Sequence, residues 1–239
     1  MSSCTFIKIN GTNLSGKNTV EASSNVQTKT FEVVDFDRLT LDVPADVAYE
    51  RADSPFLEIS APDNVMDQIV LTQEGSSLRI SFRNKIVFRG LRNFKIRLGS
   101  SSLSDLNANG ATDFDCLKGF TTDDFSVMVS GAGDLKINHL KASNVRIRIN
   151  GAGDLNLDDT RCASLDVNVS GAGDIDVKNL NCDGLLKVVV NGAGDAEVTG
   201  KTGEADLTIN GAGKINVKGL EGPIVNSSVN GIGSISKRR

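Results

Sequence analysis

Aspartates recur at nearly constant spacing along the second half of the chain, and a column of carboxylates could bind a hard metal ion. They are Asp113, Asp134, Asp154, Asp174 and Asp195. Ca²⁺ prefers carboxylate and carbonyl oxygens, so Ca²⁺ is the cofactor that this column could hold. The alternative is that each carboxylate caps a backbone amide at a tight corner. Stacked carboxylates repel one another, and either arrangement could offset this. We favour the alternative, because the spacing and period differ from those of the calcium-binding G-G-x-G-x-D nonapeptide and because Lys214 and Ser234 interrupt the column.

A second candidate binding site is a basic stretch between Glu74 and Asp105 that contains no acidic residue. Its cationic residues are Arg79, Arg83, Lys85, Arg89, Arg92, Lys95 and Arg97. Such a cluster could bind an anionic glycan or a lipid headgroup. The preferred alternative is a set of outward strand positions whose aliphatic stems cover apolar surface. The interleaved Phe82, Phe88 and Phe94 are expected in the core rather than as base-stacking platforms, so no nucleic-acid partner is expected.

Residues for catalysis are scarce. His139 is the only histidine, and it could act as a base, but it has no matching partner in other repeats, so a solvated turn residue is the preferred interpretation. The sequence contains no nucleophile elbow, phosphate-binding loop or pair of metal ligands at the usual spacing. With a single tyrosine, Tyr49, and no tryptophan, it also lacks aromatic residues for stacking sugars. We therefore predict no catalytic residues.

Two of the four cysteines occupy equivalent repeat positions. Cys162 and Cys182 both follow the first glycine of their repeats by 11 residues, so their Cα atoms should stack about 4.8 Å apart. A disulfide is within reach at that distance. The preferred alternative is a column of small apolar residues that includes Ala142. No lipobox precedes Cys4, which is therefore not expected to be a lipidated residue.

These residues are positioned by a repeat of the form S/N-G-A-G-D. Its first glycines are at 110, 131, 151, 171, 192, 211 and 231, spaced by about 20 residues. A short fixed period predicts a solenoid, in which stacked coils bury a core that no single coil could bury. We predict an all-β fold, a right-handed parallel β-helix with coils of about 20 residues.

Within each repeat, apolar residues alternate with polar ones, as in strands with one buried face. The segment that contains Val145, Ile147 and Ile149 shows this pattern, and the glycine-rich pentapeptide should form a corner. The same columns continue to Val225 in the last repeat. The alanine between the two glycines is expected to point inward. One outward column alternates in charge through Arg146, Asp166, Lys187 and Asp206, which in-register stacking makes favourable neighbours.

The first half keeps strand-like alternation without the repeat. We predict three parts: a loosely ordered segment at residues 1–30, an irregular β part of coils or a cap at 31–108, and regular repeats at 109–239, continuous with the part before. No apolar run approaches the ~18 residues of a membrane span. Met1-Ser2-Ser3-Cys4 also lacks the basic start and apolar stretch of a signal peptide, although a signal could have been removed.

Three features together resemble the head-GIN-domain family, whose members are named auto-transporter adhesins. They are the entry Phe36-Asp37-Arg38-Leu39-Thr40-Leu41, the strand Leu78 to Ser81, and the stacked S/N-G-A-G-D copies. The resemblance covers roughly residues 31–239. It implies a bacterial β-solenoid that is exported to the periplasm, outer membrane or cell surface, and it brings no catalytic residues.

The sequence therefore favours a non-enzymatic envelope or surface protein, an adhesin or binding scaffold whose partner would be a glycan or another surface protein. The alternatives are a calcium-dependent, lyase-like β-helix enzyme that acts on polysaccharides, and a purely structural envelope module. The net charge of −4 gives no general affinity for polyanions. The oligomeric state and the ligand are left open by the sequence.

Overall fold

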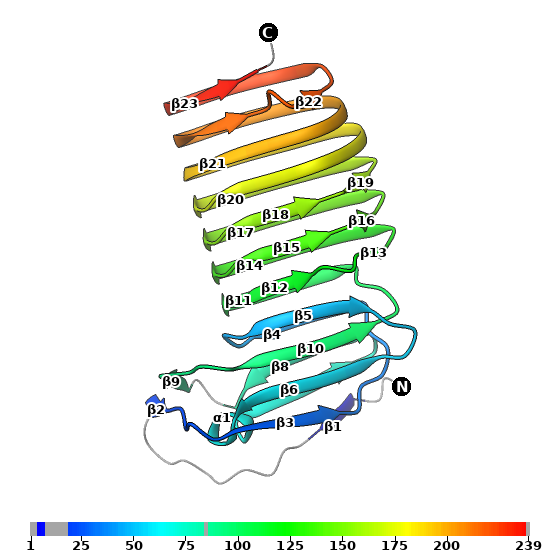
Figure 1. Cartoon of the computed structure of the whole chain (residues 1–239), viewed down its shortest axis with the longest axis vertical. Helices are drawn as coiled ribbons and strands as arrows, with labels where there is room; N and C mark the ends of the chain where they lie inside the picture. Colours follow the sequence, from blue (N-terminus) through cyan, green and yellow to red (C-terminus); the bar gives the residue numbers. More distant parts are fainter. Residues whose placement is uncertain (1–3, 8–18, 84–85, 238–239) are drawn as a thin grey trace.

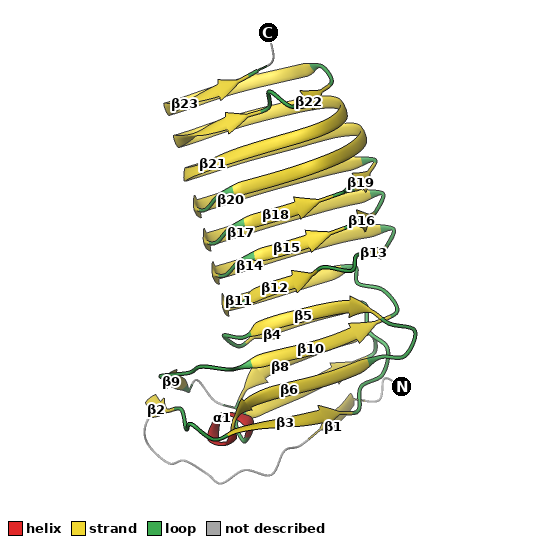
Figure 2. Cartoon of the chain, viewed as in Figure 1, coloured by secondary structure: helices red, strands yellow, loops and turns green. Residues whose placement is uncertain are grey.

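The computed structural model describes residues 4–7, 19–83 and 86–237. It is a β-solenoid of about seven turns with parallel stacked coils, which confirms the predicted fold class. The chain climbs from a cap at the N-terminal end to the last coil at the C-terminal end (Figure 1). Strands make up 72% of the structure, and the one helix among the described residues is a single turn at the base (Figure 2). The handedness of the winding stays a prediction.

Each regular coil has three sides. Side one is a long strand that ends in the glycine-rich corner one, and its strands are β11 (Asp105–Ala111), β14 (Asp124–Ala132), β17 (Asn144–Ala152) and β20 (Ser164–Ala172). Side two follows as β12 (Asp113–Cys116), β15 (Leu135–Asn138) and β18 (Leu155–Asp158). Corner two leads to the short side three, with β13 (Phe120–Thr121), β16 (Leu140–Lys141), β19 (Arg161–Cys162) and β22 (Leu220–Glu221). Corner three then returns the chain to side one.

Toward the C-terminal end the coils become almost continuous strand. β21 (Ile175–Asn216) bends through several sides without a break, and β23 (Ile224–Ser236) forms sides one and two of the last coil. Equivalent residues are in register from coil to coil, so that Val145 pairs with Leu165, and Gly151 pairs with Gly171. The repeat period read from the sequence is therefore the length of one coil.

The sequence left open whether the N-terminal half forms irregular coils or a cap, and the structure contains both, an irregular first coil and a cap. β4 (Arg38–Asp42) and β5 (Asp46–Arg51) pair in parallel with β11 and β12, so they continue sides one and two. β10 (Lys95–Ser100) then pairs in parallel with β5 and antiparallel with β6 (Phe56–Pro62). The parallel solenoid thus meets an antiparallel cap at β10.

Within the cap, the main strand pairs are antiparallel. β3 (Val26–Phe31) pairs with β6, and β7 (Ile69–Glu74) pairs with both β1 (Cys4–Ile7) and β8 (Ser77–Phe82). The one-turn helix α1 (Asp63–Met66) follows β6, and β2 (Thr19–Glu21) forms a small sheet with β9 (Val87–Arg89). β2 and β3 lie in the segment expected to be loosely ordered, so that expectation is wrong for them, because pairing with β9 and β6 satisfies their backbone groups. Residues 8–18 lie outside the described part.

The interior columns are where the alternation placed them. Val145, Ile147 and Ile149 are buried, as are their neighbours in the coils above and below. The corner alanines are a correction, because Ala132, Ala152 and Ala172 are exposed rather than inward. The reason is the backbone beside them: a Cβ on Gly151 would overlap the Gly131 carbonyl oxygen of the coil below. The corners stack backbone on backbone, and the alanine methyl group is left on the outside.

Val225 is a second correction, since it is 56% exposed instead of buried. Ala205 pairs with Ile224, but Asp206 pairs with Asn226, so Val225 is the extra residue of a β-bulge. In the preceding coil three residues separate Lys201 from Ala205, whereas only Gly222 and Pro223 separate their register partners Glu221 and Ile224, so corner three is one residue shorter in the last coil. The bulge restores the register after the shorter corner.

Tyr49 lies in the core of the first coil. Its ring stacks on Phe114 with centroids 6.1 Å apart and meets Phe120 edge-on at 5.7 Å. Its hydroxyl is 3.1 Å from the Ser100 hydroxyl. Burial raises the pKa of Tyr49 to about 12, and the hydrogen bond with Ser100 opposes that rise. This tyrosine is therefore a structural residue and not a sugar-stacking platform.

Because Tyr49 is the only tyrosine, tyrosinate absorbance reports this residue alone. We expect ionisation near pH 12 in the folded protein and near pH 10 in the denatured chain. Since the folded pKa is the higher one, the stability linked to Tyr49 is complete below about pH 10 and lost as the pH rises toward 12. Circular dichroism at each pH shows whether the chain is still folded. Ionisation near pH 10 in a folded chain would contradict the burial of Tyr49.

Candidate functional site

The aspartate column runs along corner one and forms a hydrogen-bonded ladder between coils. Each backbone amide at this position donates to the Oδ1 atom of the aspartate one coil earlier. The bonds are Asp134 to Asp113 at 3.0 Å, Asp154 to Asp134 at 3.0 Å, Asp174 to Asp154 at 2.9 Å, Asp195 to Asp174 at 2.9 Å and Lys214 to Asp195 at 2.8 Å. This is the arrangement that the amide-capping interpretation describes.

One oxygen of each carboxylate in the column is therefore already used by an amide. Among the described residues, no group of three or more His, Cys, Asp or Glu side chains is placed to hold a metal ion. The ladder ends at Lys214, because a lysine side chain has no carboxylate to accept a bond from the next coil. Calcium binding at the column, the interpretation that the sequence did not favour, is untested, and the ladder gives the carboxylates a structural role that needs no metal.

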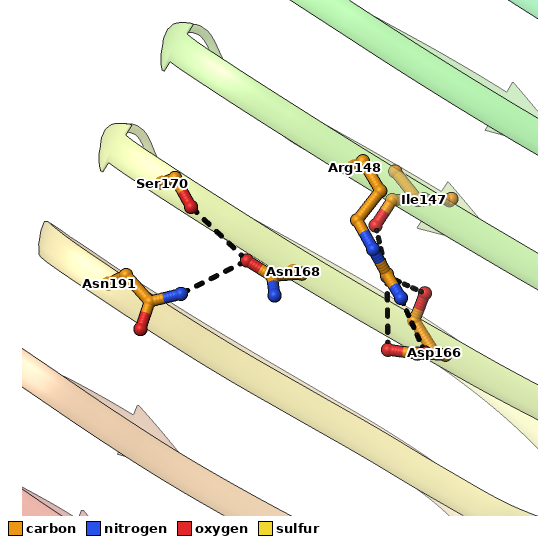
Figure 3. A network of polar contacts seen from close by, with 6 residues as sticks. All are labelled: Ile147, Arg148, Asp166, Asn168, Ser170 and Asn191. Atoms are coloured by element: carbon orange, nitrogen blue, oxygen red, sulfur yellow. Dashed lines mark hydrogen bonds and ion pairs between the residues drawn. The ribbon is translucent and has the colours of Figure 1, made fainter.

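Side one carries networks of polar side chains that cross from coil to coil (Figure 3). Arg148 makes two bonds to the Asp166 carboxylate, at 3.0 and 2.6 Å, and both side chains are half-buried. The charge pattern predicted that Asp166 would have Arg146 as its neighbour. The two are indeed in register, but the ion pair that forms is the diagonal one, because a guanidinium on a long stem reaches past the opposite residue. Asn168 accepts from both Ser170 and Asn191.

The basic stretch does not form one patch. Arg79 lies on β8, which pairs with β4 on side one, whereas Lys95 and Arg97 lie on β10, which pairs with β5 on side two. Arg79 is paired with Asp42 at 2.5 Å, and Arg97 with Glu58 at 3.3 Å. Arg83, Arg89 and Arg92 lie in or beside the loop that contains β9, and Lys85 lies outside the described residues. Phe82, Phe88 and Phe94 pack on one another, with Phe82 5.1 and 5.8 Å from the other two rings.

Lys95 and Arg97 instead line a groove of about 510 Å³ together with acidic residues, and we call it the seam groove. It lies on side two where β12 and β5 of the solenoid meet β10 and β6 of the cap. Its charged lining residues are Asp46, Glu58, Lys95, Arg97, Asp113 and Asp115. Four acids face two bases, so the groove has an acidic excess.

The strand register explains the shape of the seam groove. One row across the four strands is Asp113, Asp46, Lys95 and Ser60, and the next is Asp115, Ala48, Arg97 and Glu58. Ala48 is the only small apolar side chain in these two outward rows, and it sits in the middle of the second one. Long polar side chains around a short one leave a hollow rimmed with hydrogen-bonding groups. Such a surface can bind a polar ligand, and it holds no nucleophile with a neighbouring histidine.

His139 lies at corner two, away from the residues that line the seam groove. Its backbone has a φ of 53°, and the same left-handed conformation recurs at Asp159 (50°) and Asn179 (51°). His139 is exposed in this turn, and it is the only histidine of the sequence, so no other repeat has a matching one. The contact that the sequence did not predict is with the next coil, where Asp159 Oδ2 lies 2.8 Å from His139 Nδ1. That hydrogen bond, with Arg161 nearby, lowers the pKa of the Asp159 carboxyl. His, Asp and Asn are the non-glycine residues that adopt this conformation most readily. Their spacing of 20 residues at positions 139, 159 and 179 could therefore have revealed this column from the sequence.

Cys162 and Cys182 pair in register, as the repeat spacing predicted. Both thiols are free and buried. Ala142 precedes them in the same column and is buried too. The hydrogen bond with the neighbouring Cys182 thiol, together with burial, raises the pKa of Cys162. This is the column of small apolar residues that the sequence favoured.

A family model described as "putative auto-transporter adhesin, head GIN domain" matches residues 35–219 and again 163–237. The chain belongs to the head-GIN-domain family. The match includes the entry motif, β8 and the glycine repeats on which the sequence resemblance rests. No curated protein matches the chain.

Solved structures share the fold of this head-GIN-domain protein. A putative adhesin from Bacteroides fragilis superposes with a TM-score of 0.82 at 22% identity, covering 91% of this chain and 99% of its own. A putative adhesin from Parabacteroides distasonis gives 0.72 at 18% identity, with 92% and 99% covered. A putative lipid binding protein from the same species gives 0.61 at 23% identity, with 92% and 100% covered. At these identities the likeness shows the fold alone.

The aspartate ladder predicts a specific order of stabilities. Asp154→Ala removes the acceptor of the Asp174 amide and should lower the free energy of unfolding by about 1 kcal/mol. Asp154→Asn keeps an oxygen acceptor and should cost less than about 0.5 kcal/mol. Lys214→Ala, in the same column, removes no carboxylate and is the control. Urea unfolding followed by circular dichroism, with Ca²⁺ and with chelator, gives the comparison.

Two results would contradict this order. Equal losses for the alanine and asparagine variants would mean that the charge, and not the acceptor, matters. A loss seen only in the presence of Ca²⁺ would assign the column to a metal ion.

Proposed function

We propose that this protein is a non-enzymatic envelope or cell-surface protein, a binding scaffold of the adhesin type that presents a polar ligand site on the side of its solenoid. Membership of a family named for adhesins supports the general class. The observation that carries the proposal is the seam groove, where charged side chains from four strands surround the short side chain of Ala48. Export to the envelope or surface is part of the proposal and rests on the family.

Two features of the seam groove favour binding over catalysis. Its polar groups are exposed at an open surface, so they can exchange water for the hydroxyl groups of a glycan or the side chains of a surface protein. A polysaccharide lyase-like enzyme would need clustered acids, a Lys or Arg base, and aromatic rings for sugars. The seam groove has four acids with Lys95 and Arg97, but no aromatic residue is among its lining residues. Tyr49, the one tyrosine, is buried. None of the helices among the described residues is long and apolar enough to span a membrane.

The first test is an array of glycans and extracellular-matrix proteins, probed with Ca²⁺ and with chelator, with mass spectrometry of the incubated glycans. We expect retention without cleavage. Because one structural neighbour is named a lipid binding protein, anionic and neutral lipid vesicles belong in the same panel. Unsaturated sugar products would overturn the proposal in favour of a lyase. Absence of binding to every probe would overturn it in favour of a purely structural module.

A matched pair of variants tests whether the seam groove is the binding site. Ala48→Tyr fills the hollow without changing any charge, and it should weaken binding to any retained probe at least about tenfold. Asn156→Tyr is the control, because Asn156 lies in the same outward column three coils further along. Equal binding by both variants and wild type would place the ligand elsewhere on the molecule.

A further inference from the structure

The last coil leaves one edge of a long strand available. β23 pairs with β21 in register from Asp206–Asn226 to Asn216–Ser236. Among residues 4–7, 19–83 and 86–237, no strand pairs with its other edge. Val229 and Ile232 of β23 are 38% and 86% exposed. A strand edge of this kind offers unpaired N–H and C=O groups together with apolar side chains.

The composition of β23 sets it apart from the strands that it stacks on. None of its 13 residues is charged, and it contains no proline. The corresponding side-one strands of earlier coils carry charges, such as Arg146 and Arg148 in β17 and Asp166 in β20. Proteins commonly place lysine or proline on an exposed edge strand to prevent pairing with other chains. β23 has neither device.

The opposite end of the molecule is built differently. There the cap turns the sheet antiparallel, and its strands lie with α1 across the end of the solenoid (Figure 1). β3, in that cap, carries Lys29 within the strand. The uncharged edge of β23 can therefore pair with the same edge of a second copy, whereas β3 of the cap carries a charge.

We propose that two copies of this chain pair through the free edges of their β23 strands, related by a two-fold axis. The axis reverses one strand, so the new ladder between copies is antiparallel and includes side one of each last coil. A neutral strand can face itself without like-charge repulsion, which is why the composition of β23 points to a second copy as its partner. Because the caps differ from this edge, the assembly stops at two.

The residues that flank β23 are complementary in charge under this symmetry. Glu221 precedes the strand and Lys237 follows it. Reversal of one strand brings the end of β23 in one copy toward β22 of the other, and so brings each Lys237 toward the Glu221 of its mate. Within one copy, Glu221 is 3.4 Å from Lys201, on an exposed surface that a second cation can also reach.

Sedimentation over a range of protein concentrations tests this proposal. We expect a monomer–dimer equilibrium in the wild type. Ser228→Lys, in the middle of side one, places like charges across the two-fold axis and should weaken dimerisation several-fold, up to about tenfold. Thr208→Lys is the control, because Thr208 is the register partner of Ser228 one coil earlier and is covered by β23. It should dimerise like the wild type.

A charge exchange tests the orientation. Glu221→Lys and Lys237→Glu should each weaken the dimer, and the double variant should regain affinity. A wild type that is monomeric at every concentration would overturn the proposal, as would assemblies that grow into fibres, which require head-to-tail contacts. A double variant weaker than either single one would overturn the antiparallel arrangement. Glycan or lipid binding plays no part in these measurements, so their failure leaves the seam groove proposal unaffected.

Discussion

The close approach of backbone to backbone at corner one holds successive coils in register. Gly131, Gly151 and Gly171 lie directly above one another, with φ values of 131°, 140° and 136°. A Cβ at any of them would overlap the carbonyl oxygen of the coil below. Glycine is therefore required here for space as well as for conformation. The contact fixes the height of each coil, and the aspartate ladder then ties successive corners together.

Because the register is fixed, the residues at one repeat position stack into a column, and the side chains of a column share similar surroundings. Interior columns bury apolar side chains from coil to coil, and outward columns bring polar groups into contact, as in the pairing of Arg148 with Asp166. Both proposed binding surfaces lie where this regularity stops. The seam groove lies where the parallel coils meet the antiparallel cap. The free edge of β23 lies where the stack ends.

The regular part of this fold could be predicted from the sequence because a period of 20 residues and strand alternation act together. The errors arose where local geometry overrides that pattern. Ala132 points outward because its neighbouring glycines fill the corner with backbone, and Val225 is expelled by a shortened corner. The seam groove was not predictable, because Ala48, Glu58 and Arg97 belong to strands without a repeat, and only the pairing of β5, β6 and β10 unites them.

The importance of the corner contact is measured most directly by the free energy of unfolding of Gly151→Ala compared with that of Ala152→Ser. Both changes lie at the same corner, but only the first adds an atom toward the coil below. We predict a loss of more than about 2 kcal/mol for Gly151→Ala and a change within about 0.5 kcal/mol for Ala152→Ser. If Gly151→Ala unfolded like the wild type, the corner contact would not be what holds the coils in register.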